Sequence, residues 1–157
     1  MQKITPCLWF DGNAMEAVDF YLSVFKRSKV TDVMYYGDAG PGKKGDVLCV
    51  NFELEGQGFM ALNGGPEFHF TPAISLFVDC ASQQEIDELW ERLLDGGQPM
   101  ECGWLTDRFG VSWQIVPGFL GEMLRDTNRE RADRVMRAML KMIKLDVALL
   151  ERAYAGE

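Results

Sequence analysis

The chain contains two related stretches, TPCLWFDGNAMEAVDFYLSVF at residues 5–25 and TPAISLFVDCASQQEIDELWERLL at residues 71–94. Each opens with a Thr-Pro pair and a short apolar run, which predicts a strand. A polar residue with a glutamate three positions later follows each run, and this pattern is typical of a helix N-terminus. The two pairs are Asn13 with Glu16 and Ser82 with Glu85. An internal repeat of this kind predicts two copies of one structural module.

The rest of each copy predicts a helix and then strands. Apolar residues recur at helical spacing within 14–25 and within 86–94, so each stretch predicts one amphipathic helix. Alternating or β-branched runs follow at residues 29–36, 48–54 and 59–63, and in shorter form at 100–106 and 111–116. We therefore expect an α+β protein built from two βαβββ modules, the first at residues 1–66 and the second at residues 67–118.

Residues 119–157 predict a helical C-terminal extension. Thr127 and Glu130 form a T-x-x-E capping box, and an apolar stripe runs from Ala132 to Ile143. A shorter helix is expected over 146–154. We interpret this extension as a cover for a sheet or as a dimer face.

The composition excludes several classes of protein. Hydrophobic residues make up 47% of the 157-residue chain, enough for a substantial core. The net charge of −8 repels phosphate backbones, so we expect no nucleic-acid partner. No apolar run approaches the ~20 residues of a membrane span, and the first residues do not resemble a signal peptide. We expect a cytoplasmic protein whose four separated cysteines form no disulfide framework.

Several phrases resemble the vicinal oxygen chelate superfamily, which includes glyoxalase I, extradiol dioxygenases and the fosfomycin and bleomycin resistance proteins. They are WFDGNAMEAVDFYLSVF, ALNGGPEF, AISLFVDC, CGWLTDRFGVSWQIVPG and the tail RVMRAMLKMIKLDVALLERAYAG. The last two resemble its PhnB-like branch, some members of which carry the label demethylubiquinone methyltransferase. This resemblance covers essentially the whole chain and implies paired βαβββ modules and a homodimer.

Metal-dependent members of this superfamily hold one divalent ion with His or Glu side chains from four strands. The resemblance places Ala61, Ala73 and Gln114 at three of these positions, and residues 4–7 contain no His or carboxylate. Alanine cannot coordinate an ion, and a neutral amide is a poor replacement for a carboxylate. We therefore expect no metal ion and no cofactor.

With no ionic ligands, the strands predict an uncharged pocket for a small organic molecule. The predicted ligand-binding residues are Cys7, Trp9, Phe59, Ala61, Asn63, Ala73, Ser75, Phe77, Trp104, Ser112 and Gln114. Strand alternation groups Phe59 and Asn63 with Ala61, and Cys7 and Trp9 are expected to join them. No catalytic residue is identified. Asp107 is interpreted as a turn residue in preference to an acid–base group, and His69 as a loop residue in preference to a general base.

Three functions stay open. The favoured one is a metal-free protein that binds a small molecule, with or without a reaction. The second is antibiotic sequestration, as in bleomycin-binding relatives, for which an acidic surface would attract a cationic drug. The third is the methyltransferase activity of the family label, which lacks support because no Gly-rich strand-to-helix loop is present.

Overall fold

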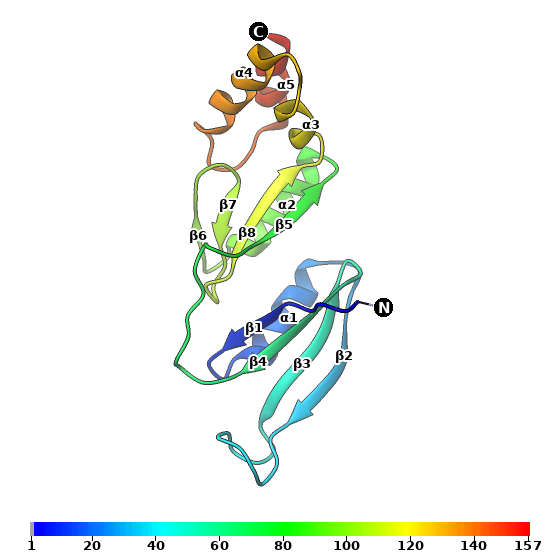
Figure 1. The fold of residues 1–157 in the computed structure, drawn as a ribbon, viewed down its shortest axis with the longest axis vertical. Helices are drawn as coiled ribbons and strands as arrows, with labels where there is room; N and C mark the ends of the chain where they lie inside the picture. Colours follow the sequence, from blue (N-terminus) through cyan, green and yellow to red (C-terminus); the bar gives the residue numbers. More distant parts are fainter. Residues whose placement is uncertain (1) are drawn as a thin grey trace. The chain divides into compact units, whose positions relative to one another are not determined.

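A computed structural model describes residues 2–157 of the chain. Its elements follow the predicted order, with the βαβββ pattern occurring twice (Figure 1). In the first copy they are β1 (Cys7–Phe10), α1 (Ala14–Val24), β2 (Ser28–Tyr35), β3 (Val47–Leu54) and β4 (Gln57–Asn63). In the second copy they are β5 (Ser75–Cys80), α2 (Gln83–Leu94), β6 (Gln98–Pro99), β7 (Trp104–Thr106) and β8 (Ser112–Pro117). The extension forms α3 (Leu120–Leu124), α4 (Arg129–Met139) and α5 (Val147–Ala155).

The chain divides into two compact units, one ending at Phe70 and the other running from Thr71 to Glu157. Each unit contains one four-stranded sheet, called sheet A in the first (order β1-β4-β3-β2) and sheet B in the second (order β5-β8-β7-β6). In both, the first strand pairs in parallel with the last, and the remaining neighbours are antiparallel. The predicted α+β class and the two-module architecture are confirmed.

One helix packs on one face of each sheet. In unit 1, Val18 and Tyr21 of α1 are fully buried together with Val50 and Phe52 of β3, and the rings of Tyr21 and Phe52 stack at 6.4 Å between centroids. In unit 2, α2 packs on β7 and β8, where Leu105 and Ile115 are fully buried. Figure 1 shows α1 and α2 behind the strands of their own sheets. We call the opposite face of each sheet its open face.

The helix starts agree only partly with the capping predictions. Ser82 caps α2 as expected, because its hydroxyl accepts a hydrogen bond from the Glu85 amide at 3.2 Å. Asn13 precedes α1 but its side chain makes no capping bond, so that prediction is wrong. Thr127 does not cap α4 either. The cap is Asn128, whose side-chain oxygen accepts from the Arg131 amide at 3.2 Å, so the helix begins one residue later than the box predicted.

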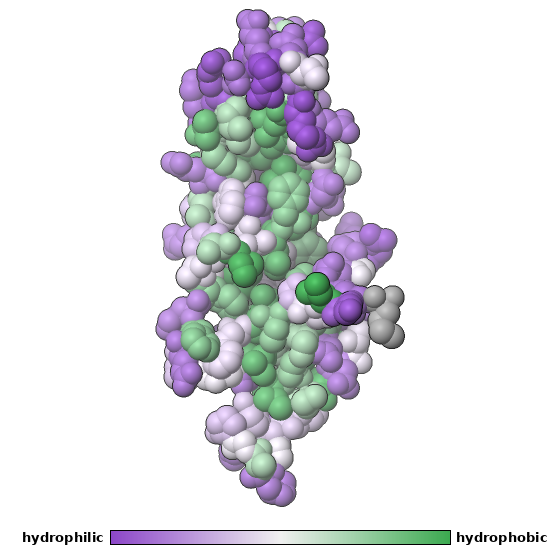
Figure 2. All heavy atoms as spheres, in the orientation of Figure 1, coloured by the Kyte–Doolittle hydropathy of each residue, from purple (hydrophilic) through white to green (hydrophobic). Residues whose placement is uncertain are grey.

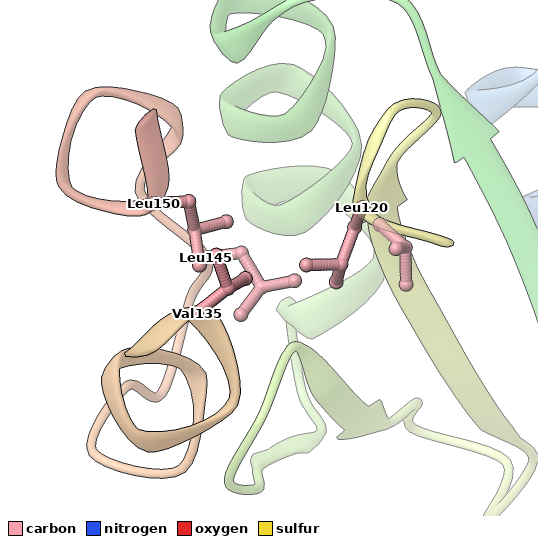
Figure 3. Close-up of a cluster of buried hydrophobic side chains, with 5 residues drawn as sticks. Leu120, Val135, Leu145 and Leu150 are labelled. Atoms are coloured by element: carbon pink, nitrogen blue, oxygen red, sulfur yellow. The ribbon is translucent and has the colours of Figure 1, made fainter. Parts of the chain in front are cut away.

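Within unit 2, a small hydrophobic core packs the extension against the second βαβββ module. The side chains of Leu120, Val135, Leu145 and Leu150 point toward one another (Figure 3), and Val116 of β8 completes the cluster. The amides of Cys102 and Gly103 donate to the carbonyls of Met142 and Ile143 at 2.8 and 2.7 Å. The predicted continuous stripe is wrong, since α4 ends at Met139 and the side chains of Met136, Leu140 and Ile143 are exposed. None of the helices described over residues 2–157 is both long and apolar enough to cross a membrane.

Candidate functional site

The open face of sheet B carries two rows of uncharged side chains that run across three strands. Strand pairing sets Phe77 and Trp104 on either side of Gln114. It sets Ser75 and Thr106 on either side of Ser112 in the same way. Since directly paired residues point to the same face of a sheet, one row is aromatic–amide–aromatic and the next is three hydroxyls. The structure thus brings five of the predicted ligand-binding residues together.

Two polar groups on this face are held differently. The Gln114 side-chain amide donates to the Ser75 hydroxyl at 2.9 Å, which orients the amide over the sheet. The Ser112 hydroxyl oxygen is buried and has no hydrogen-bond partner among the described residues, and the residue is only 1% exposed. A buried polar atom without a partner costs free energy. An unpaired group of this kind is commonly explained by strain, by function or by an unseen partner.

The open face of sheet A carries Cys7 and Trp9 of β1, Met60 and Leu62 of β4, and Asn51 of β3. Figure 2 shows hydrophobic residues gathered over this unit on the visible face, with hydrophilic residues around them. The Asn51 side-chain oxygen is buried and without a partner among the described residues. Among residues 2–157, each open face therefore carries a buried side-chain oxygen that has no hydrogen-bond partner.

Three predicted site residues of β4 lie on the helix side instead. Ala61 pairs with Leu8 and Val50, which are 7% and 0% exposed, and Ala61 itself is 0% exposed. Phe59 packs in the same core, with its ring 5.5 Å from that of Phe52. The prediction that Phe59, Ala61 and Asn63 share a face with Cys7 and Trp9 is wrong, because Cys7 pairs with Met60.

Asn63 has a structural role that the sequence did not reveal. Its side-chain oxygen accepts from the Ala14 amide at 2.9 Å, which satisfies the first amide of α1 in place of the absent Asn13 cap. Its side-chain amide donates to the Val47 carbonyl at 3.0 Å. Its own carbonyl accepts from the Tyr36 hydroxyl at 2.7 Å. Asn63 therefore joins α1, β3 and the end of β2.

Trp9 is held by the loop that follows β4. Its indole N–H donates to the Gly65 carbonyl at 2.8 Å, and the Phe68 ring meets it edge-on at 4.8 Å. A side chain at Gly64 would lie 2.4 Å from the indole ring, so the glycine is what lets the loop approach. This arrangement leaves Trp9 less available for ligand stacking than Phe77, which is 60% exposed.

Ala73 does not lie on a strand. It is exposed in the turn before β5, which begins at Ser75, and its amide donates to the Thr71 hydroxyl at 3.3 Å. Ala73 therefore lies two residues before β5, because the Thr-Pro pair forms a turn that precedes the strand rather than opening it. By strand parity, Ser75 and Phe77 are the β5 residues of the open face.

Asp107 is a turn residue, as predicted. One carboxylate oxygen accepts from the amides of Phe109 and Val111 at 2.8 and 3.0 Å. The other accepts from the Trp113 indole at 2.9 Å, and the residue is 3% exposed. His69 is exposed in the loop between β4 and β5. Cys49 is not an activated thiol. Burial raises its pKa most, and the neighbouring Cys7 and Asp32 raise it further.

Comparison with known proteins identifies the family. The family model described as 3-demethylubiquinone-9 3-methyltransferase matches residues 2–116. The PhnB protein of Bacillus cereus, which carries the same description, is 40% identical with a TM-score of 0.68, over 74% of this chain and 99% of that one. The chain belongs to the 3-demethylubiquinone-9 3-methyltransferase family.

Two more distant structures share the fold. A Pseudomonas aeruginosa protein is 23% identical over 72% of this chain and 95% of its own, with a TM-score of 0.60. The fosfomycin resistance protein FosX of Listeria monocytogenes, solved with Mn(II) and sulfate, is 16% identical over 80% and 100% of the two chains, with a TM-score of 0.55. These likenesses show that the chain shares the fold of both structures. No curated protein matches the chain.

The open face of sheet B offers few of the side chains that hold a divalent metal ion. On the open faces, Cys7 pairs with Met60 in sheet A, and Phe77 pairs with Gln114 and Ser75 with Ser112 in sheet B. Mn²⁺ prefers carboxylate, carbonyl and imidazole ligands, and strands β5–β8 contain one carboxylate, Asp79, and no histidine. Within residues 2–157, no three His, Cys, Asp or Glu side chains gather in a way that could hold a metal.

Proposed function

We propose that this protein binds a small organic molecule on the open faces of its sheets, through amide, hydroxyl and aromatic groups and without a metal ion. The observation that carries the proposal is the pair of buried oxygens on Asn51 and Ser112, one on each open face and neither with a partner. A ligand with hydrogen-bonding groups would satisfy them once the side chains that cover them move aside. Binding sites are typically apolar with a few directional polar groups, and this describes both faces.

Methyl transfer, the activity in the family description, has less support. Folds that bind a nucleotide-like cofactor at a helix N-terminus present a Gly-rich loop between a strand and a helix of a parallel sheet. Each sheet of this protein has only one parallel pair among its described strands. The loop of Gly64 and Gly65 leads toward β5 rather than into a helix. We therefore propose binding and assign no reaction.

The proposed setting is a homodimer in the cytoplasm. Met34 and Tyr35 are 52% and 58% exposed on β2, which is an edge strand of sheet A. Exposed apolar edge strands invite pairing with another chain, and closed dimers are the commonest assemblies. The four cysteines are free thiols, which suits a reducing compartment. Light scattering during size exclusion would report the oligomeric state.

A thermal-unfolding screen tests the proposed binding. The protein, treated with EDTA, is melted with neutral, anionic and cationic organic molecules. A ligand at about 100 times its Kd adds about 2.7 kcal/mol of stability, which raises the Tm of a protein of this size by about 5–10 °C. Gln114→Leu is expected to abolish the shift, whereas Gln84→Leu on the exposed face of α2 should preserve it. No shift with any class would contradict the proposal.

A further inference from the structure

The side chains on the open face of sheet B limit the charge of the ligand that can bind there. Strands β5 to β8 contain no lysine, arginine or histidine. Beyond Phe77 on β5, the next residue of the same parity is Asp79, which is exposed. A carboxylate or phosphonate placed here would lose its water without gaining a cationic partner, and that loss is costly.

The same face also limits the shape of its ligand. Gln114 lies between the aromatic residues Phe77 and Trp104 on the two neighbouring strands. Since neighbouring strands are about 4.8 Å apart, the two aromatic residues are about 9.6 Å apart. A flat ring fits over the amide between two such side chains, where stacking contributes. Toward the C-terminal end of β8, Val116 points to the same face as Gln114. It is covered there by the hydrophobic core of the C-terminal extension. A ligand therefore cannot extend that way.

Hydrogen bonding at this face is offered by an oriented amide and a buried hydroxyl. The Gln114 amide is fixed by its bond to Ser75, and an amide has a further N–H and an acceptor oxygen. The Ser112 hydroxyl can donate and accept, and it has no partner. Both groups belong to β8, two residues apart on one face. Because Ser112 is only 1% exposed, a ring substituent bonded to Gln114 reaches the Ser112 hydroxyl once the side chains that cover it move.

Resting on the proposed function, we infer that the open face of sheet B takes an uncharged planar ring that carries a carboxamide, carbonyl or hydroxyl group. The ring lies between Phe77 and Trp104, and its polar group bonds to Gln114 and Ser112. Anionic ligands such as the phosphonates are excluded by the lack of a cation. The extension, which lies beyond the residues matched by the family model, closes one end of the face and restricts ligand length.

Three probes that share the same phenyl ring but differ in charge test the effect of ligand charge separately from that of ligand shape. Benzamide, benzoate and phenylphosphonate are titrated into the isotope-labelled full chain, and the side-chain amide signal of Gln114 and the indole signal of Trp104 are followed by NMR. Benzamide is expected to shift both signals and to bind about tenfold or more tightly than either anion, because an unpaired buried charge is costly. Benzoate or phenylphosphonate binding as tightly as benzamide would overturn the inference and leave the proposed function standing. Failure of all three probes to shift these signals would also overturn it, while the wider melting screen judges the proposed function separately.

Two serine variants distinguish binding from folding. Ser112→Ala removes a hydroxyl without a partner, so the Tm is expected to stay equal or rise, while benzamide affinity falls by about 3- to 10-fold. Ser82→Ala removes the cap of α2, so the Tm is expected to fall while affinity is unchanged. A Ser112→Ala protein with a lowered Tm and unchanged affinity would show that the hydroxyl is structural and would overturn its assigned contact.

Discussion

Asn63 and Asn51 lie on neighbouring strands of sheet A and point to opposite faces. Substituting each in turn tests which face contributes to the stability of the fold. Asn63→Ala removes the acceptor for the Ala14 amide and the donor to the Val47 carbonyl. The helix cap contributes about 1 kcal/mol, and the second bond about 0.5–1.5 kcal/mol. The expected loss is about 2 kcal/mol in the free energy of unfolding, or roughly 4–8 °C in Tm.

Asn51→Ala is the matched control. It removes the same side chain from the same sheet, but its buried oxygen has no partner to lose. We expect a change within about 0.5 kcal/mol. Both free energies can be measured by urea unfolding followed by tryptophan fluorescence and circular dichroism. Equal stability losses in the two variants, or a larger loss at Asn51, would refute the assignment of faces.

Three further predictions concern unit 2. The Trp113 indole N–H donates to the Asp107 carboxylate, so Asp107→Asn places an amide N–H against it. We expect a loss of about 2–4 kcal/mol in the free energy of unfolding measured in urea. An unchanged midpoint of urea unfolding would contradict the role of Asp107 in the buried turn. Gly97→Ala places a Cβ 2.0 Å from a backbone carbonyl, whereas Gly37→Ala meets nothing within 4 Å, so only the first should lower the Tm, by several degrees. Burial raises the pKa of Cys80 to about 12 from 9.0, so the folded thiol should resist alkylation at pH 10. Because the unfolded thiol ionises first, Cys80's contribution to stability should be lost as the pH rises from about 9 to 12; rapid labelling of native Cys80 would show that it is not buried.

The repeat made the architecture predictable. Two copies of a capped amphipathic helix followed by alternating strands leave few arrangements, and both sheets have the same strand order. The capping pattern located α2 because Ser82 has no competitor there. It failed at α1, where the first amide bonds to Asn63, 49 positions away in the sequence. A contact at that distance leaves no local signal.

The face of β4 could not be predicted because both of its faces are apolar. Phe59 and Ala61 alternate with Met60 and Leu62, so hydrophobicity does not tell which set faces the helix. Register decides it, through the pairing of Cys7 with Met60. On β8, by contrast, Ser112 and Gln114 alternate with Trp113 and Ile115, so the apolar set indicates the helix side and leaves the polar set on the open face.

Trp113 and Gln114 are consecutive residues on opposite faces of β8, and they provide the most direct test of the central claim. The measurement is an NMR titration of the protein, freed of metal with EDTA and then of EDTA, with benzamide, which follows the side-chain signals of both residues. The Kd is measured by calorimetry with and without added Mn²⁺. We predict a shift at Gln114, little or none at the buried Trp113 indole, and the same Kd with and without the metal. A shift confined to Trp113, or binding that appears only with Mn²⁺, would contradict a metal-free ligand site on the open face.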